Sequence, residues 1–84
     1  MDFQKKIDKL EKAVIIFKEV LDDLDLKIEA REDKFNERSE KWQESEKGDE
    51  FNEETERMQD VRNDVESEIE TIESAIESLR ELSE

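Results

Sequence analysis

Apolar residues recur along the first half of the chain at the spacing of a coiled-coil seam. One row steps by seven residues, and a second row lies three residues behind it. The rows are Ile7, Val14, Leu21, Ile28, Phe35 and Trp42, and Phe3, Leu10, Phe17, Leu24, Arg31 and Arg38. Because steps of three and four residues return to the same face of a helix, the pattern predicts a helix over about residues 3–47.

A second seam follows the only glycine of the chain. Its rows are Phe51, Met58, Val65, Ile72 and Leu79, and Thr55, Arg62, Ile69, Ile76 and Ser83. They predict a second helix over about residues 50–83. Gly48 suits the left-handed conformation that ends a helix, and Asp49 suits the cap of the next, so the turn is predicted at residues 48–49. The expected fold is all-α, with one domain formed by an antiparallel two-helix coiled-coil hairpin.

The two seams fit each other in one antiparallel register. Its layers include Trp42 with Thr55, Ile28 with Ile69, Leu21 with Ile76, Phe17 with Leu79, and Val14 with Ser83. The first helix then extends about twelve residues beyond the second, and its apolar side chains there have no partner. Those uncovered side chains are Phe3, Ile7 and Leu10. We interpret Arg31, Arg38 and Arg62 as polar layers that fix the register, with an anion site as the alternative.

One flank of the seam is apolar near the open end of the hairpin, and the other is ionic. The apolar flank comprises Ala13, Ile16, Val20, Ala75 and Leu82, and the ionic flank comprises Glu11, Lys18, Asp25, Glu66, Glu73 and Arg80. Together with Phe3, Ile7 and Leu10, the apolar flank predicts a contact surface. The economical interpretation is a homodimer with a four-helix core at the open end, and single exposed apolar side chains on a monomer are the alternative.

The negative charge is concentrated in the second helix. Residues 1–48 carry 11 Lys/Arg and 14 Asp/Glu, whereas residues 49–84 carry 3 and 14, a net charge of −11. Helical spacing arranges many of these acids in an acidic stripe, which comprises Glu53, Glu56, Asp60, Glu66, Glu70, Glu73 and Glu77. Neighbouring carboxylates on such a stripe lie about 5–6 Å apart, near the spacing of phosphates along a nucleic-acid strand. The stripe predicts either a nucleic-acid mimic or a solvated face that keeps the protein soluble.

The residues of most catalytic sites are missing from the sequence. Histidine and cysteine are absent, and no glycine-rich phosphate loop is present, so we expect neither an enzyme nor a metal or cofactor site. The net charge of −14 makes direct binding to nucleic acid unfavourable. The longest apolar run, residues 13–17, is too short to cross a membrane, and no signal-peptide pattern opens the chain. We therefore expect a cytoplasmic protein.

Residues 38–48, with the sequence RSEKWQESEKG, resemble a run that recurs in short uncharacterised proteins of phages and other mobile elements. The resemblance implies no catalytic or binding residue. It implies a context, in which small acidic proteins are often inhibitors of host defence, including restriction and CRISPR enzymes. Within this run Trp42 is interpreted as a core residue that fills the space opposite Thr55, with an exposed residue that anchors a binding partner as the alternative.

Two functions agree with these features. The first is a phage-type interaction module that inhibits a basic, nucleic-acid-handling host protein by presenting the acidic stripe in place of nucleic acid. The second is a structural or adaptor coiled coil that binds a partner helix through the apolar flank. The first requires exposed carboxylates on the second helix, and the second requires exposed apolar side chains beside the seam.

Overall fold

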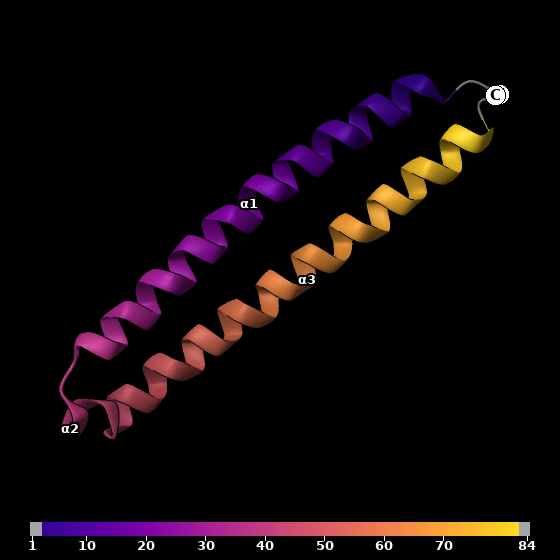
Figure 1. The fold of residues 1–84 in the computed structure, drawn as a ribbon. Helices are drawn as coiled ribbons and strands as arrows, with labels where there is room; N and C mark the ends of the chain where they lie inside the picture. The colour runs from indigo at the N-terminus through magenta and orange to yellow at the C-terminus, as the bar shows by residue number, and fades with distance from the viewer. Residues whose placement is uncertain (1–2, 83–84) are drawn as a thin grey trace.

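The chain folds into a long helical hairpin. The structure is a computed structural model that describes residues 3–82 as α1 (Gln4–Glu37), α2 (Glu40–Gln43) and α3 (Glu46–Leu82). The two long helices run antiparallel, and the short α2 lies at the closed end (Figure 1). The molecule measures 63 × 14 × 12 Å, and the described residues include no strand. The predicted all-α hairpin is therefore confirmed.

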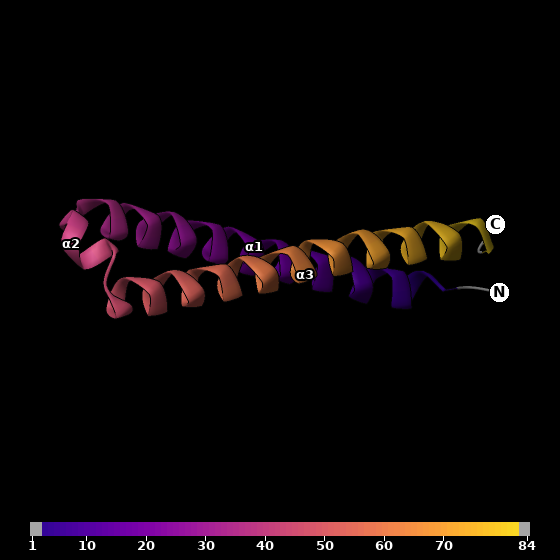
Figure 2. The same cartoon turned by 90° about the horizontal axis from the view of Figure 1, so that it is seen from below.

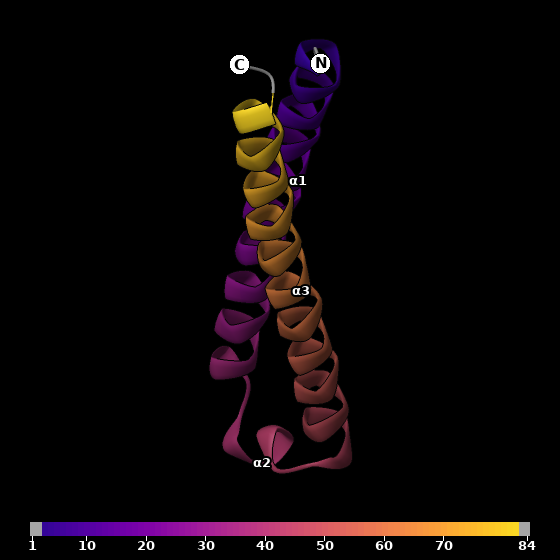
Figure 3. The same ribbon diagram turned by 90° about the vertical axis from the view of Figure 1, so that its right-hand side faces the viewer.

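The long helices wind around each other. They cross near the middle of the rod when the hairpin is viewed from below (Figure 2). When the hairpin is turned about the vertical axis, α2 is seen between the closed ends of α1 and α3 (Figure 3). Such winding is typical of a seven-residue apolar repeat, because the repeat is slightly shorter than two full helical turns and the seam drifts around each helix.

The core lies in the open half of the hairpin and consists of seam residues. Its buried members are Ile7, Val14, Ile69 and Ile76, and those packed against them are Phe3, Leu10, Phe17, Leu21, Val65, Ile72 and Leu79. Fully burying an aliphatic side chain of this size contributes roughly 1.5–3 kcal/mol. The seam that the sequence predicts is therefore the interface that holds the two helices together.

The predicted register is wrong by about one heptad. Val14, predicted to face residue 83, lies instead beside Ile76 across the seam. Residue 83 itself is outside the described residues. A shift by a whole heptad leaves each seam residue in the seam and changes only its partner. It also removes the predicted overhang, so that Phe3 and Leu10 pack on the core and Ile7 is 0% exposed.

The predicted turn is also in the wrong place. Helix α1 ends at Glu37 rather than near residue 47, and α3 already begins at Glu46. Lys47, Gly48 and Asp49, which were predicted to form the end, the turn and the next cap, all lie in the first turn of α3. Gly48 has no positive φ. The hairpin therefore reverses over residues 38–45.

Side-chain caps explain why the reversal comes early. The Oγ of Ser39 accepts a hydrogen bond from the Trp42 amide at 3.2 Å, and the Oγ of Ser45 accepts one from the Gly48 amide at 3.3 Å. Each serine thus satisfies a free amide at the start of a helix. The side chain of Gln43 donates to the carbonyl oxygens of Phe35, at 2.9 Å, and Arg38, at 3.1 Å, at the end of α1. The run RSEKWQESEKG is therefore the turn of the hairpin.

Gly48 is needed for close packing rather than for a special backbone conformation. It is buried where the first turn of α3 meets the end of α2. A Cβ at this position would lie 2.5 Å from the carbonyl oxygens of both Trp42 and Gln43. Because these are backbone atoms, a side chain at residue 48 requires the turn itself to move.

We expect Gly48→Ala to lower the free energy of unfolding by about 1–3 kcal/mol, the usual cost of overpacking. Helix propensity alone predicts the opposite sign, a gain of about 1 kcal/mol for alanine over glycine within a helix. Urea denaturation followed by circular dichroism measures the difference. Asn52→Ala, on the exposed surface of the same helix, is the control and should change stability little. A stabilised Gly48→Ala variant would contradict the close-packed turn.

Candidate interaction surfaces

The ionic flank joins the two long helices by polar contacts along one side. Its ion pairs are Arg80 with Glu11, Lys18 with Glu73 at 3.6 Å, and Arg62 with Asp25 at 2.7 Å. A hydrogen bond of 3.0 Å from Gln59 to Glu32 continues the row toward the turn. Exposed pairs of this kind are worth about 0.2–1 kcal/mol each. Their main effect is to favour the observed register, because a shift of either helix would break all of them together.

Arg62 is a structural cation rather than an anion site. Its hydrogen bond to Asp25 raises the pKa of the guanidinium, desolvation opposes this, and attraction to Asp25 and Glu66 adds to it. The same guanidinium also pairs with Glu66, one turn further along α3. Two carboxylates already pair with Arg62, so its charge is used within the hairpin, at the edge of the seam. This agrees with the interpretation of Arg62 as a polar layer.

The acidic stripe divides into neutralised and free carboxylates. Glu66, Glu73 and Glu77 pair with Arg62, Lys18 and Arg80, respectively. The remaining members are exposed and form no ion pair within residues 3–82. These four, which we call the acidic face, are Glu53, Glu56, Asp60 and Glu70. The surface that remains negative is thus smaller than the stripe that the spacing predicts.

Three aromatic rings fill the closed end of the hairpin. Phe35 of α1 lies 5.9 Å from Trp42 and 6.4 Å from Phe51, measured between ring centroids. Trp42 meets Phe51 edge to face at 5.8 Å. The predicted pairing of Trp42 with Thr55 is therefore wrong, because residue 42 belongs to the turn instead of to α1. The half-buried indole packs α2 against both long helices.

Arg31 forms a second polar layer beneath these rings. Its Nε donates to the Oγ1 of Thr55 at 2.9 Å, and its Nη2 donates to the Phe51 carbonyl oxygen at 3.0 Å. The guanidinium also lies over the Phe51 ring, 4.0 Å from its centroid. Arg31 therefore anchors α1 to α3 and is satisfied there. The interpretation as a polar layer fits these contacts.

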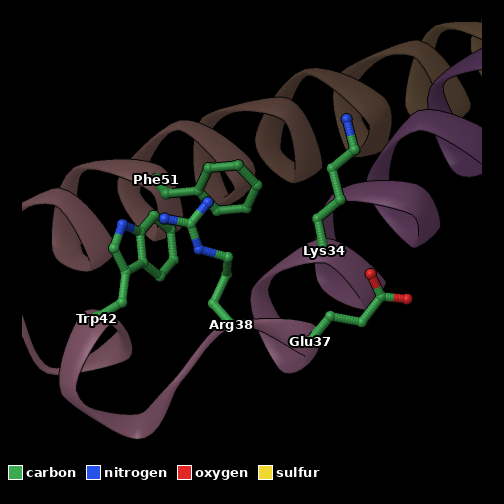
Figure 4. Close-up of a pocket in the computed structure, with 5 residues that line it drawn as sticks. All are labelled: Lys34, Glu37, Arg38, Trp42 and Phe51. Carbon is green, nitrogen blue, oxygen red and sulfur yellow. The ribbon is translucent and has the colours of Figure 1, made fainter.

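A shallow hollow opens beside the aromatic rings, away from the ionic flank. It is lined by Lys34, Glu37, Arg38, Trp42 and Phe51 (Figure 4). The guanidinium of Arg38 lies 4.3 Å from the centroid of the Trp42 ring and so stacks on the indole. Arg38, predicted as a seam residue, is instead exposed at the end of α1. The hollow offers charged rims and an aromatic floor, without a pair of side chains placed as nucleophile and base.

The apolar flank is exposed, whereas the other residues of the predicted contact surface are not. Ile16, Val20 and Leu82 are 60%, 41% and 64% exposed, Ala75 is also exposed, and Ala13 is half-buried. Phe3, Ile7 and Leu10 instead belong to the hairpin core, so their place in the contact surface was wrong. Val61, 46% exposed, was missed, although it lies two heptads before Ala75 and hence on the same flank.

No protein-family model, curated protein or solved structure matches the chain. Within residues 3–82, no group of three acidic side chains is arranged to hold a metal ion. None of the helices in this range combines the length and the apolar character that crossing a membrane requires. The acidic face and the apolar flank are therefore the two surfaces from which a function can be proposed.

We expect Thr55→Val to lower the free energy of unfolding by about 1–3 kcal/mol, because the Nε of Arg31 loses its partner in a half-buried layer. Thr55→Ser keeps the hydroxyl and should lower the free energy of unfolding by a smaller amount. In the Arg31→Met background, Thr55→Val should lower the free energy of unfolding by markedly less than it does alone, because the Arg31 donor is already absent. Urea denaturation of the four variants measures this coupling. Equal losses with and without Arg31 would contradict the polar layer.

Proposed function

We propose that this protein is a non-enzymatic interaction module that binds a basic, nucleic-acid-handling protein through the acidic face of α3. The observation that supports this most is the set of four exposed carboxylates of the stripe that have no cationic partner within residues 3–82, whereas the other three members of the stripe are paired. Glu53, Glu56 and Asp60 are three and four residues apart, so their spacing approaches that of phosphates and suits a groove that normally holds a nucleic-acid strand.

The shape of the hairpin supports the same function. A rod 63 Å long and 14 Å wide presents its charge along a line, as a nucleic-acid strand does. Its helices are held by a continuous seam, so the line of carboxylates is ordered before binding, which lowers the entropic cost of association. In this proposal the protein acts in the cytoplasm as an inhibitor, in keeping with the resemblance of the turn to proteins of phages and mobile elements.

A second candidate function is favoured by the exposed apolar flank. Ile16, Val20 and Leu82 lie beside a seam that is already complete, and such side chains are usually covered in a functional assembly. We propose that this flank mediates homodimerisation. An adaptor role, in which the flank binds a helix of another protein, is the alternative.

Capture from a nuclease-treated bacterial lysate tests the acidic face. We expect the immobilised chain to retain basic nucleic-acid-binding proteins at low salt and to release them at high salt or on addition of duplex DNA, because the attraction is ionic. The triple variant Glu53→Gln, Glu56→Gln, Asp60→Asn should lose this capture. Mass spectrometry of the eluted proteins, with quantities compared between variants, provides the measurement.

The matched control removes the same charges from α1. Glu19→Gln, Glu29→Gln, Asp22→Asn neutralises two glutamates and one aspartate that are exposed on the other long helix. This control should capture the same proteins as the unaltered chain. Equal losses in the two triple variants would show that net charge alone attracts the partners, and capture that is insensitive to salt would exclude nucleic-acid mimicry.

A further inference from the structure

The two flanks of the hairpin use their charged residues differently. On the ionic flank, three ion pairs connect α1 with α3. On the apolar flank the charges are Lys6, Lys27 and Lys34 from α1, and Glu54 and Glu68 from α3. Within residues 3–82 none of these five forms an ion pair between the helices, and Glu54 pairs only with Arg57 of its own helix. The charges of this flank therefore do not connect the two helices.

Charge on the apolar flank is separated by helix. Beside the seam on this flank, the heptad row of α1 contains Lys6, Ala13, Val20, Lys27 and Lys34, with no acid. The corresponding row of α3 contains Glu54, Val61, Glu68, Ala75 and Leu82, with no base. A surface with one positive and one negative edge is complementary to itself when the α1 edge of one copy meets the α3 edge of another.

Four of the five apolar members of the two rows gather toward the same end, and the fifth, Val61, lies nearer the turn. Ala13 and Val20 lie in the first half of α1, and Ala75 and Leu82 lie in the last part of α3, so all four are near the open end. The lysines at 27 and 34 and the glutamate at 54 lie toward the turn. When both hairpins point the same way, these four apolar residues of one copy meet those of the other, and Lys27, Lys34 and Glu54 of the two copies meet near the turn; Lys6, at the open end, is the charged exception.

We propose that a second copy of the chain covers the apolar flank with both hairpins pointing in the same direction, so that α1 of each copy lies on α3 of the other. The two-fold axis then runs along the rod and gives a four-helix bundle with antiparallel neighbours. Reversing one hairpin about an axis across the rod would place α1 on α1, with lysines facing lysines and glutamates facing glutamates. Like charges in such contacts disfavour that arrangement.

This arrangement rests on the homodimerisation proposed above and specifies its geometry. It leaves the acidic face exposed, because Glu53, Glu56, Asp60 and Glu70 lie on the side of α3 away from both the seam and the apolar flank. The dimer therefore carries two acidic faces related by the two-fold axis. A partner that binds both would itself present two basic grooves.

Sedimentation equilibrium tests the surface. The unaltered chain should be a dimer, and Val20→Glu should raise its dissociation constant by about tenfold or more, because it places a charge in the buried interface. Leu26→Glu is the matched control, since Leu26 is 65% exposed on the outward side of α1, and it should leave the constant unchanged. Circular dichroism confirms that both variants remain helical. If Val20→Glu left the dissociation constant of the dimer unchanged, the proposed surface would be overturned.

A charge exchange tests the complementarity. Lys27→Glu, Lys34→Glu should dissociate the dimer, and so should Glu54→Lys, Glu68→Lys, whereas an equimolar mixture of the two should associate. Lys5→Glu, Lys12→Glu changes the net charge as much as the first variant at exposed positions away from the flank, and it should remain dimeric. Failure of the mixture to associate would overturn the pairing of lysine and glutamate edges.

Disulfide trapping tests the direction, because the chain has no cysteine of its own. Chains with Ala13→Cys, mixed with chains carrying Ala75→Cys, should form a cross-linked heterodimer. Cross-linking of Ala13→Cys with Lys34→Cys instead would show that one hairpin is reversed, and would overturn the arrangement while the dimer stands. A monomer at the highest soluble concentration would overturn both the dimer and its geometry. Neither result affects the acidic face, which the capture experiment measures separately.

Discussion

The position of the turn decides which side chains of α1 and α3 meet. In an antiparallel hairpin, moving the reversal along the chain moves every facing partner by twice that distance. The caps at Ser39 and Ser45, the bonds from Gln43 and the close approach at Gly48 fix the reversal at residues 38–45. The ion pairs of the ionic flank and the layer formed by Arg31 and Thr55 then match only this register. The buried seam supplies most of the stability, but a coiled-coil seam accepts any shift by one heptad almost equally.

Because periodicity defines the seam whereas the turn defines the register, only some features could be predicted from the sequence. Seam members such as Val14 and Ile76 follow from periodicity, and they remain in the core whichever heptad faces them. The turn does not follow from periodicity, because Trp42 continues the row of α1 although it lies in α2. Glycine suggested a left-handed helix end, but the two serines three residues before their capped amides carried the stronger signal. The error in the turn then moved Ile7 from the predicted overhang into the core.

The candidate surfaces were predicted in part for the same reason. Exposure on a helix depends on position around its axis, so Ile16, Val20 and Leu82 were assigned to the exposed flank regardless of register. Pairing depends on register, so the sequence did not show that Glu73 meets Lys18 or that Arg62 connects Asp25 with Glu66. The acidic face is what remains once these contacts are taken away from the stripe.

Cations pair across the seam on the ionic flank but not on the apolar flank, and this difference links the apolar flank to the acidic face. The chain has only three cations after residue 48, and two of them, Arg62 and Arg80, pair across the seam on the ionic flank. If stability of a single hairpin were the only requirement, Lys27 and Lys34 would be expected to pair with Glu54 and Glu68 on the other flank in the same way, because such pairs lower the repulsion along α3. They do not pair within the described chain, and the apolar side chains beside them are exposed. In the proposed dimer a second copy would relieve both features together, because it would supply glutamates to the lysines and apolar surface to Val20, while the carboxylates of the acidic face would stay in water.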